Sequence, residues 1–267
     1  TNFTWVPVYN RVEKIYFLYS ILSLKAAWGI NMEIFTGTDD YKYDLNEAQM
    51  RKKRSIEILK VHNVPYIQHL PVIKTANNVR VRTAKEIAQR AIACLFALQI
   101  ASDAAGAPGN FKKSRKFFGE KLIELGLEGF LTQKEQKIFK GKCNNQDFVS
   151  MTWKYEAFWV LLWALGIVEQ LDYPSEVCDC EFVLHAVANC DNMDDFMKKV
   201  KLRDISEILD EADLIFRYDW ACIDARVHEE DAPAGLNPDV VYERHCGLNW
   251  LIDADGADDW DNVAINI

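Results

Sequence analysis

Residues 153–166 read WKYEAFWVLLWALG and decide the fold. Trp153, Glu156, Val160 and Trp163 are spaced i, i+3, i+7 and i+10, which places them on one face of a helix. The remaining positions are also mainly apolar, so the helix carries hydrophobic side chains on nearly all sides. Such a helix belongs at the centre of a domain, where other helices cover it. Glu156 brings an ionisable group into that interior and therefore needs a partner there.

Composition and charge narrow the class of protein. The chain has 267 residues, of which 49% are hydrophobic and 27% charged, and this suits one globular domain with an extension. A net charge of −9 and a pI near 5.1 argue against a phosphate-binding surface, so we expect no nucleic-acid partner. The apolar runs 91–101 and 158–168 are shorter than the roughly 20 residues of a spanning helix, so we expect no membrane association. Seven scattered cysteines and no visible signal peptide predict a cytoplasmic protein.

Helical periodicity and end signals predict helices along most of the chain. Asp44, Thr83, Thr132 and Asp204 each precede a glutamate by three residues, which is the pattern of a capping box. Asn237 is a good N-cap because a proline follows it at the first helical position. The expected helices lie at about 1–30, 44–61, 84–102, 111–126, 133–141, 150–166, 181–188, 204–228 and 237–252.

The fold class predicted from this pattern is all-α, because no segment alternates convincingly as a strand does. We expect a single multi-helix globular domain, residues 51–267, around the central Trp-rich helix at about 150–166. Ser150 is expected to cap that helix, and Gly166 to end it in the left-handed conformation. Residues 1–50 are expected to form an N-terminal helical extension.

Several short phrases, taken in order, resemble one known family. They are RSIEIL (54–59), HLP (69–71), RTAKEIAQR (82–90), LWALG (162–166), Trp220 with DAR (224–226), ERH (243–245), LNW (248–250) and DWD (259–261). The chain resembles, over about residues 54–263, the bacterial helical family known as domain of unknown function 4272. The Cys246-Gly247 pair departs from it, because a larger or apolar pair is expected there. The resemblance implies a helical fold and carries no activity.

Polar residues on faces that otherwise look buried form the candidate site. If Glu156 faces Arg82, Arg90 or Arg244, a charged cluster lies in a cavity walled by aromatic rings. Such a cluster could bind an anionic or planar ligand, with arginine as a bidentate donor and tryptophan as a stacking wall. The alternative is that buried ion pairs fix the register of the helices. The candidate ligand-binding residues are Arg82, Glu86, Arg90, Glu156, Trp163, Arg217, Trp220, Asp224, Arg244, His245 and Asn249.

Metal sites have weaker support. Asp253, Asp255 and Asp258 lie in an acidic segment with oxygen ligands for calcium, but the glycine position and the closing glutamate of an EF-hand are missing. Asp224 and His228, at i and i+4, could supply two ligands, although an ion pair is the more common use. A zinc site would use Cys178, Cys180, His185 and Cys190, which lack a C-x-x-C pair. We therefore predict neither a metal ion nor a cofactor.

Catalytic motifs are also lacking in the sequence. It contains no nucleophile elbow, P-loop or H-E-x-x-H motif. His245 and Cys246 are adjacent on an expected helix, so their side chains diverge by about 100° and form no dyad alone. We predict a binding or interaction protein without catalysis, whose acidic surface suits a basic protein partner, for example as an immunity-like protein. The alternative is an enzyme or small-ligand binder that uses the arginine and glutamate cluster.

Overall fold

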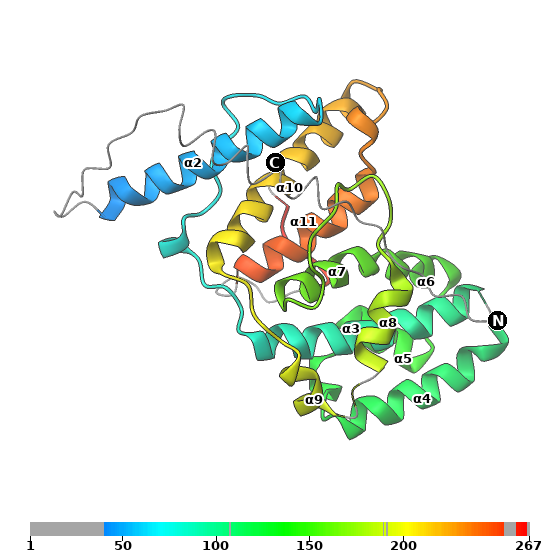
Figure 1. Ribbon diagram of the computed structural model, residues 1–267. Helices are drawn as coiled ribbons and strands as arrows, with labels where there is room; N and C mark the ends of the chain where they lie inside the picture. The colour runs from blue at the N-terminus through cyan, green and yellow to red at the C-terminus, as the bar shows by residue number, and fades with distance from the viewer. Residues whose placement is uncertain (1–39, 107, 189, 191, 254–259, 266–267) are drawn as a thin grey trace, which may run out of the picture. The chain divides into compact units, whose positions relative to one another are not determined.

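The computed structural model describes residues 40–106, 108–188, 190, 192–253 and 260–265 (Figure 1). Its helices are α2 (Asp40–Val61), α3 (Ala84–Gly106), α4 (Phe111–Glu124), α5 (Gln133–Lys140), α6 (Asn145–Thr152), α7 (Lys154–Ala164), α8 (Cys180–Ala188), α9 (Met193–Lys198), α10 (Ile205–Val227) and α11 (Pro238–Ile252). Over these described ranges there is no strand, only an isolated bridge between Arg80 and Asp253. The all-α prediction is confirmed. The helix expected at about 1–30 lies outside the described residues.

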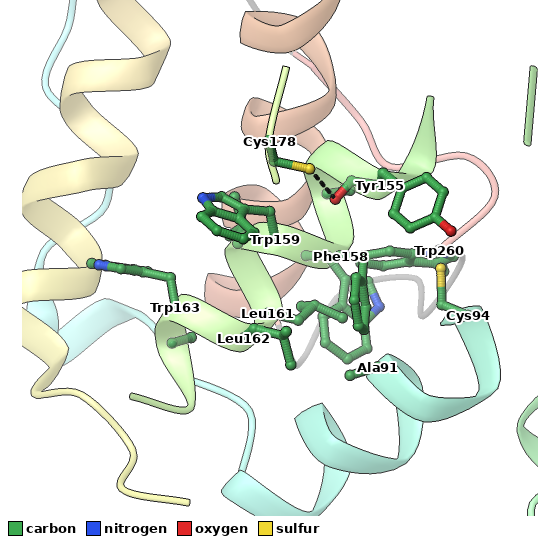
Figure 2. Packing of buried hydrophobic residues seen from close by; sticks show 14 of the residues in the cluster. Ala91, Cys94, Tyr155, Phe158, Trp159, Leu161, Leu162, Trp163, Cys178 and Trp260 are labelled. Atoms are coloured by element: carbon green, nitrogen blue, oxygen red, sulfur yellow. Dashed lines mark hydrogen bonds between the residues drawn. The ribbon is translucent and has the colours of Figure 1, made fainter. Parts of the chain in front are cut away.

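Helix α7 is the centre of the unit that begins at Asp40. All of residues 155–164 are buried, as expected for a helix that is apolar on nearly all sides. It packs against α11 on one side and α3 on another. Figure 2 shows Phe158, Leu161 and Leu162 near Ala91 of α3. The Trp-rich stretch therefore holds the helical core together as predicted.

Gly247 of α11 lies directly against α7. A Cβ atom at this position would lie 3.1 Å from the backbone oxygen of Ala157 and 3.1 Å from Cβ of Val160. Both neighbours belong to α7, and a backbone oxygen cannot move aside as a flexible side chain can. Glycine therefore allows α7 and α11 to approach closely.

Several predicted helix ends are confirmed by their hydrogen bonds. Thr132 accepts from the backbone N–H of Glu135 while the Glu135 side chain accepts from the N–H of Thr132, which is a complete capping box. The same reciprocal bonds join Thr83 and Glu86. Asn237 caps α11, which begins with a proline and ends at Ile252 as predicted. These ends depend on residues close in sequence, which is why they could be predicted.

Other predicted ends are wrong. Helix α2 already includes Asp40, so Asp44 does not begin it. Ser150 lies inside α6 and caps no helix, because the capping box of Asn144 and Asp147 already begins α6. The helix is interrupted at Trp153, and α7 begins at the next residue. Gly166 does adopt the predicted left-handed conformation just after α7, with φ of 73°. None of the described helices is both long and apolar enough to cross a membrane.

Candidate functional site

Glu156 and Arg244 form a buried ion pair between α7 and α11. Arg244 Nε donates to Glu156 Oε2 at 2.9 Å, and the N–H of Cys178 donates to Oε1 at 2.5 Å. Arg244 Nη1 also donates to the backbone oxygen of Asp172 at 2.6 Å. Both side chains are less than 5% exposed. Of the three arginines considered for Glu156, Arg244 is therefore the one that meets it, and the pair fixes α7 against α11.

Arg90 pairs instead with Glu135 of α5. Its Nη2 donates to both carboxylate oxygens at 2.5 Å, and its Nη1 donates to the backbone oxygen of Phe130 at 2.7 Å. The guanidinium carbon lies 5.6 Å from the centre of the Trp260 ring. This pair connects α3 with α5, and neither partner contacts Glu156 through a hydrogen bond.

Two further buried pairs involve α10. Arg217 donates to both oxygens of Asp213 at 2.8 Å and to the backbone oxygen of Pro71 at 3.2 Å, which holds the connector 62–83 against α10. His245 Nδ1 lies 2.7 Å from Asp219 Oδ2, and both side chains are buried. Because an ionised carboxylate can only accept, Nδ1–H is the donor here. The Asp219–His245 pair therefore joins α10 to α11 and fixes the tautomer of the histidine.

A cleft of about 510 Å³ opens beside Trp250. Arg82 packs over the Trp250 ring, with 4.0 Å between the guanidinium carbon and the ring centre, and its Nε donates to the Trp250 backbone oxygen at 2.7 Å. His245 and Asn249 also line the cleft, and so does Lys74 on its rim. We call this space the Trp250 cleft. It brings together three of the predicted site residues: Arg82, His245 and Asn249.

A second cleft, of about 550 Å³, lies on the other side of the same stack. Arg82 and Trp250 line both spaces, and Glu86, Arg90 and Trp260 line the second one. Hydrogen bonds from Thr83 lower the pKa of Glu86, which therefore stays ionised near neutral pH. This carboxylate makes the second cleft less suited to an anion than the Trp250 cleft.

The remaining predicted site residues lie away from both clefts. Trp163 packs under the guanidinium of Arg203, with 4.8 Å between the guanidinium carbon and the ring centre. Trp220 is partly buried against the core, and Asp224 lies 3.8 Å from Nδ1 of His228 in a partly exposed pair. The structure therefore divides the predicted cluster into separate pairs and a cleft, and the eleven residues do not form one cavity.

The metal candidates that the structure describes form no site either. In the part of the chain that the structure describes, no group of three or more histidine, cysteine, aspartate or glutamate side chains is placed to hold a metal ion. Asp253 pairs with Lys74 at 2.7 Å, and Asp255 and Asp258 lie outside the described residues. Burial raises the pKa of Cys246 to about 11, so its thiol is not an activated nucleophile beside His245.

Sequence reasoning missed several groups that complete this geometry. Asp219, Glu135 and Lys74 come from segments distant in sequence from their partners, so no spacing rule could pair them. Trp250 and Trp260 pack edge to face, with 5.2 Å between ring centres. Both tryptophans occur in the phrases that carry the family resemblance, and this was the one available signal for them.

The comparisons with known proteins give a family and little else. The family model described as "Domain of unknown function (DUF4272)" matches residues 51–263, which confirms the resemblance seen in the sequence. No curated protein and no solved structure matches the chain at a significant level. The activity must therefore be argued from the geometry of this chain.

Proposed function

The chain belongs to the family described as domain of unknown function DUF4272, and because that description names no activity, we propose a function from geometry: a binding protein whose Trp250 cleft takes a small planar anion. A carboxylate attached to a flat apolar body is the chemistry that fits best. The proposal keeps the ligand-binding alternative from the sequence, but places the ligand beside Trp250 and away from Glu156.

The observation that carries this proposal is the stack of Arg82 on Trp250 at the wall of the cleft. The Arg82 side chain is 3% exposed, and its Nε is already directed by the Trp250 backbone oxygen. A guanidinium fixed in this way loses little conformational entropy when an anion binds, and a planar carboxylate matches its donors. Burial of the arginine beside a cleft thus supports a role in recognition.

The other walls favour the same chemistry. Val72, Ile73 and Phe216 give one side of the cleft an apolar surface, which suits the body of a flat ligand. Lys74 adds a second positive charge at the rim, although Asp253 lies 2.7 Å from it. Its contribution is therefore smaller than that of Arg82.

The proposal is tested by analysing small molecules released from protein that was purified from its native host under mild conditions. Mass spectrometry should find one carboxylate-bearing compound with a flat apolar body in wild type. Arg82→Ala should lose it, and Lys74→Met, a change on the exposed rim, should retain less of it. Arg203→Ala is the matched control, because Arg203 also stacks on a tryptophan but lines neither cleft. Equal retention in Arg82→Ala and wild type, or no compound at all, would contradict the proposal.

The expected basic protein partner, immunity-like or otherwise, stays a prediction. Beyond the net charge of −9, it is favoured by the exposed carboxylates of Glu229, Glu230 and Asp231 just after α10. Pull-down at physiological salt tests it, with a variant in which these three residues are changed to lysine. A basic protein bound at stoichiometric amounts by wild type and released by the variant would support it, and its absence from both would count against it.

A further inference from the structure

A smaller pocket, of about 150 Å³, is lined by α2, α10, α11 and the connector 165–179. It shares no lining residue with the Trp250 cleft. Glu211 and Tyr218 of α10, His62 just after α2 and Tyr173 of the connector contribute polar and aromatic walls, and leucine and isoleucine side chains contribute most of the apolar surface. We call it the Glu211 pocket.

Two polar groups in this pocket have no partner. Among the described residues, the Glu211 carboxylate makes no hydrogen bond and no ion pair, although the residue is only partly exposed. The Tyr218 hydroxyl likewise has no hydrogen bond within the described part of the chain, although Tyr218 is 4% exposed. Because the protein satisfies neither group, both leave hydrogen-bonding capacity on the wall of this pocket that a ligand can use.

The charge of the pocket favours a cation as that partner. Arg244 lines the pocket, but its charge is already balanced by Glu156 at 2.9 Å. Glu211 makes no ion pair among the described residues, although the more distant charges of Arg244 and Arg203 act on it, and Asp172 also lines the pocket. An anion would therefore meet net repulsion, whereas a cation would give Glu211 its counter-ion.

The aromatic walls and the volume define the cation further. The rings of His62 and Tyr173 stack with 4.5 Å between centres, and Tyr218 meets Tyr173 edge to face at 5.6 Å. Aromatic rings attract alkylammonium groups, and a space of about 150 Å³ holds a molecule of the size of benzene. We propose that the Glu211 pocket binds a small primary ammonium with an apolar body, with Glu211 as counter-ion and the Tyr218 hydroxyl as hydrogen-bond acceptor.

The ionisation of Glu211 makes this binding dependent on pH. Burial, and then the Asp210 carboxylate, raise the pKa of Glu211 to about 7, whereas Arg244 and Arg203 act in the opposite direction. The ionisable groups around it are His62 just after α2, Asp172 and Tyr173 of the connector, Asp210 and Tyr218 of α10, Arg244 of α11, and Arg203. Because an ammonium requires the ionised carboxylate, affinity should be full at about pH 8 and should fall as pH falls through about 7.

Calorimetric titration of the full chain with isopentylamine tests the proposal. A dissociation constant on the order of 1 mM is expected at about pH 8, given the small number of atoms in the probe. At about pH 6 the constant should be roughly tenfold larger, because about one Glu211 carboxyl in eleven is then ionised. Isopentanol and isovalerate share the carbon skeleton but are neutral and anionic, so each should bind at least tenfold more weakly.

Variants locate the binding in the pocket. Glu211→Gln keeps the shape of the side chain and should weaken isopentylamine binding at least tenfold while removing most of the pH dependence. Glu207→Gln, one turn earlier on α10 and paired with Arg203 at 2.9 Å, should bind within about twofold of wild type. Since histidine also changes charge in this pH range, the series is repeated in His62→Gln, which should keep the pH dependence.

Three outcomes would overturn the proposal: isopentanol or isovalerate binding as tightly as the amine, unchanged amine binding in Glu211→Gln, or no amine binding at tens of millimolar. Each variant is first checked for its thermal unfolding midpoint, so that loss of binding is read only from folded protein. Because the pocket and the Trp250 cleft share no residue, these results are independent of those for the proposed anion.

Discussion

Two glutamates lie close to Arg244, and their surroundings differ in kind. Glu156 is 2% exposed and accepts hydrogen bonds from Arg244 Nε and from the N–H of Cys178. Glu211 lies in a pocket that Arg244 also lines, yet receives no hydrogen bond from any described residue. Arg244 therefore donates a hydrogen bond to the Glu156 carboxylate and none to the Glu211 carboxylate.

This difference separates a carboxylate that stabilises the fold from one that can still bind a ligand. A buried carboxylate with directed donors keeps its ionised form at the cost of a fixed geometry, and it has no capacity left for a ligand. A buried carboxylate without hydrogen-bond donors is destabilised in its ionised form by desolvation. A cationic ligand that donates to it can offset that destabilisation. Proximity to Arg244 thus says less about function than the hydrogen bonds do.

The largest expected effect comes from removing the structural charge. Glu156→Gln keeps the size of the side chain but leaves the Arg244 guanidinium buried without a counter-ion, so the free energy of unfolding should fall by about 3 to 5 kcal/mol. Urea unfolding near neutral pH measures this change. Glu207→Gln is the exposed control and should change stability by less than about 1 kcal/mol. A loss below about 1 kcal/mol in Glu156→Gln would remove the distinction between the two glutamates.

The same substitution at Glu211 should have the opposite sign. A folded-state pKa near 7, above the ordinary value of 4.5, means that the folded protein holds this proton more tightly than the unfolded chain does. Ionisation therefore costs stability, with no cost below about pH 4.5 and the full cost above about pH 7. Glu211→Gln should exceed wild type in free energy of unfolding by up to about 3 kcal/mol at about pH 8, and match it at about pH 4.5. Equal stabilities at both pH values would show that the pKa is not raised.

A substitution that moves α11 away from α7 should weaken the contrast between Glu156 and Glu211, because it disturbs the Glu156–Arg244 pair. Gly247→Ala places a methyl group against the Ala157 backbone oxygen, so α11 must shift and the hydrogen bond between Arg244 and Glu156 should lengthen. We expect a loss of about 1 to 3 kcal/mol in urea unfolding. Gly119→Ala in α4 is the matched control, since nothing lies within 4 Å of its added Cβ. That variant should be neutral or slightly more stable.

The smallest expected effect concerns a hydroxyl group. Tyr218→Phe removes an oxygen that has no hydrogen bond from the described residues, so stability should change by less than about 0.5 kcal/mol. Chemical unfolding measures stability, and the same sample is titrated with isopentylamine, whose binding should weaken a few-fold. A loss of more than about 1.5 kcal/mol would indicate that the hydroxyl has a structural partner instead.

Much of the fold could be predicted because its signals are local. The apolar stretch at 153–166 identified the central helix, and Asn237 with the following proline identified the start of α11. The break at Trp153 could not be predicted, since α6 leads into α7 with no glycine or proline between them to mark a helix end. The start of α6 was also not predicted, because the capping box at Asn144 uses asparagine and aspartate in place of the threonine and glutamate found elsewhere.

The candidate sites were less predictable, because they depend on contacts across the fold. Arg82 and Asn249 were identified as polar residues on helix faces, and both line the Trp250 cleft. Glu211 was not identified, because it follows Asp210 and resembles part of a solvated acidic face. Only the packing of α2 and the connector 165–179 over α10 removes it from solvent. Burial of this kind has no marker in the local sequence.

Gly247 also has an evolutionary consequence. Helix α11 supplies Arg244 and Leu248 to the Glu211 pocket, and His245 and Asn249 to the Trp250 cleft. Gly247 allows the close approach of this helix to α7, although the glycine lines neither proposed site. Mutation there should shift the linings of both proposed sites in one step, so a lineage could change the binding proposed here without altering any lining residue.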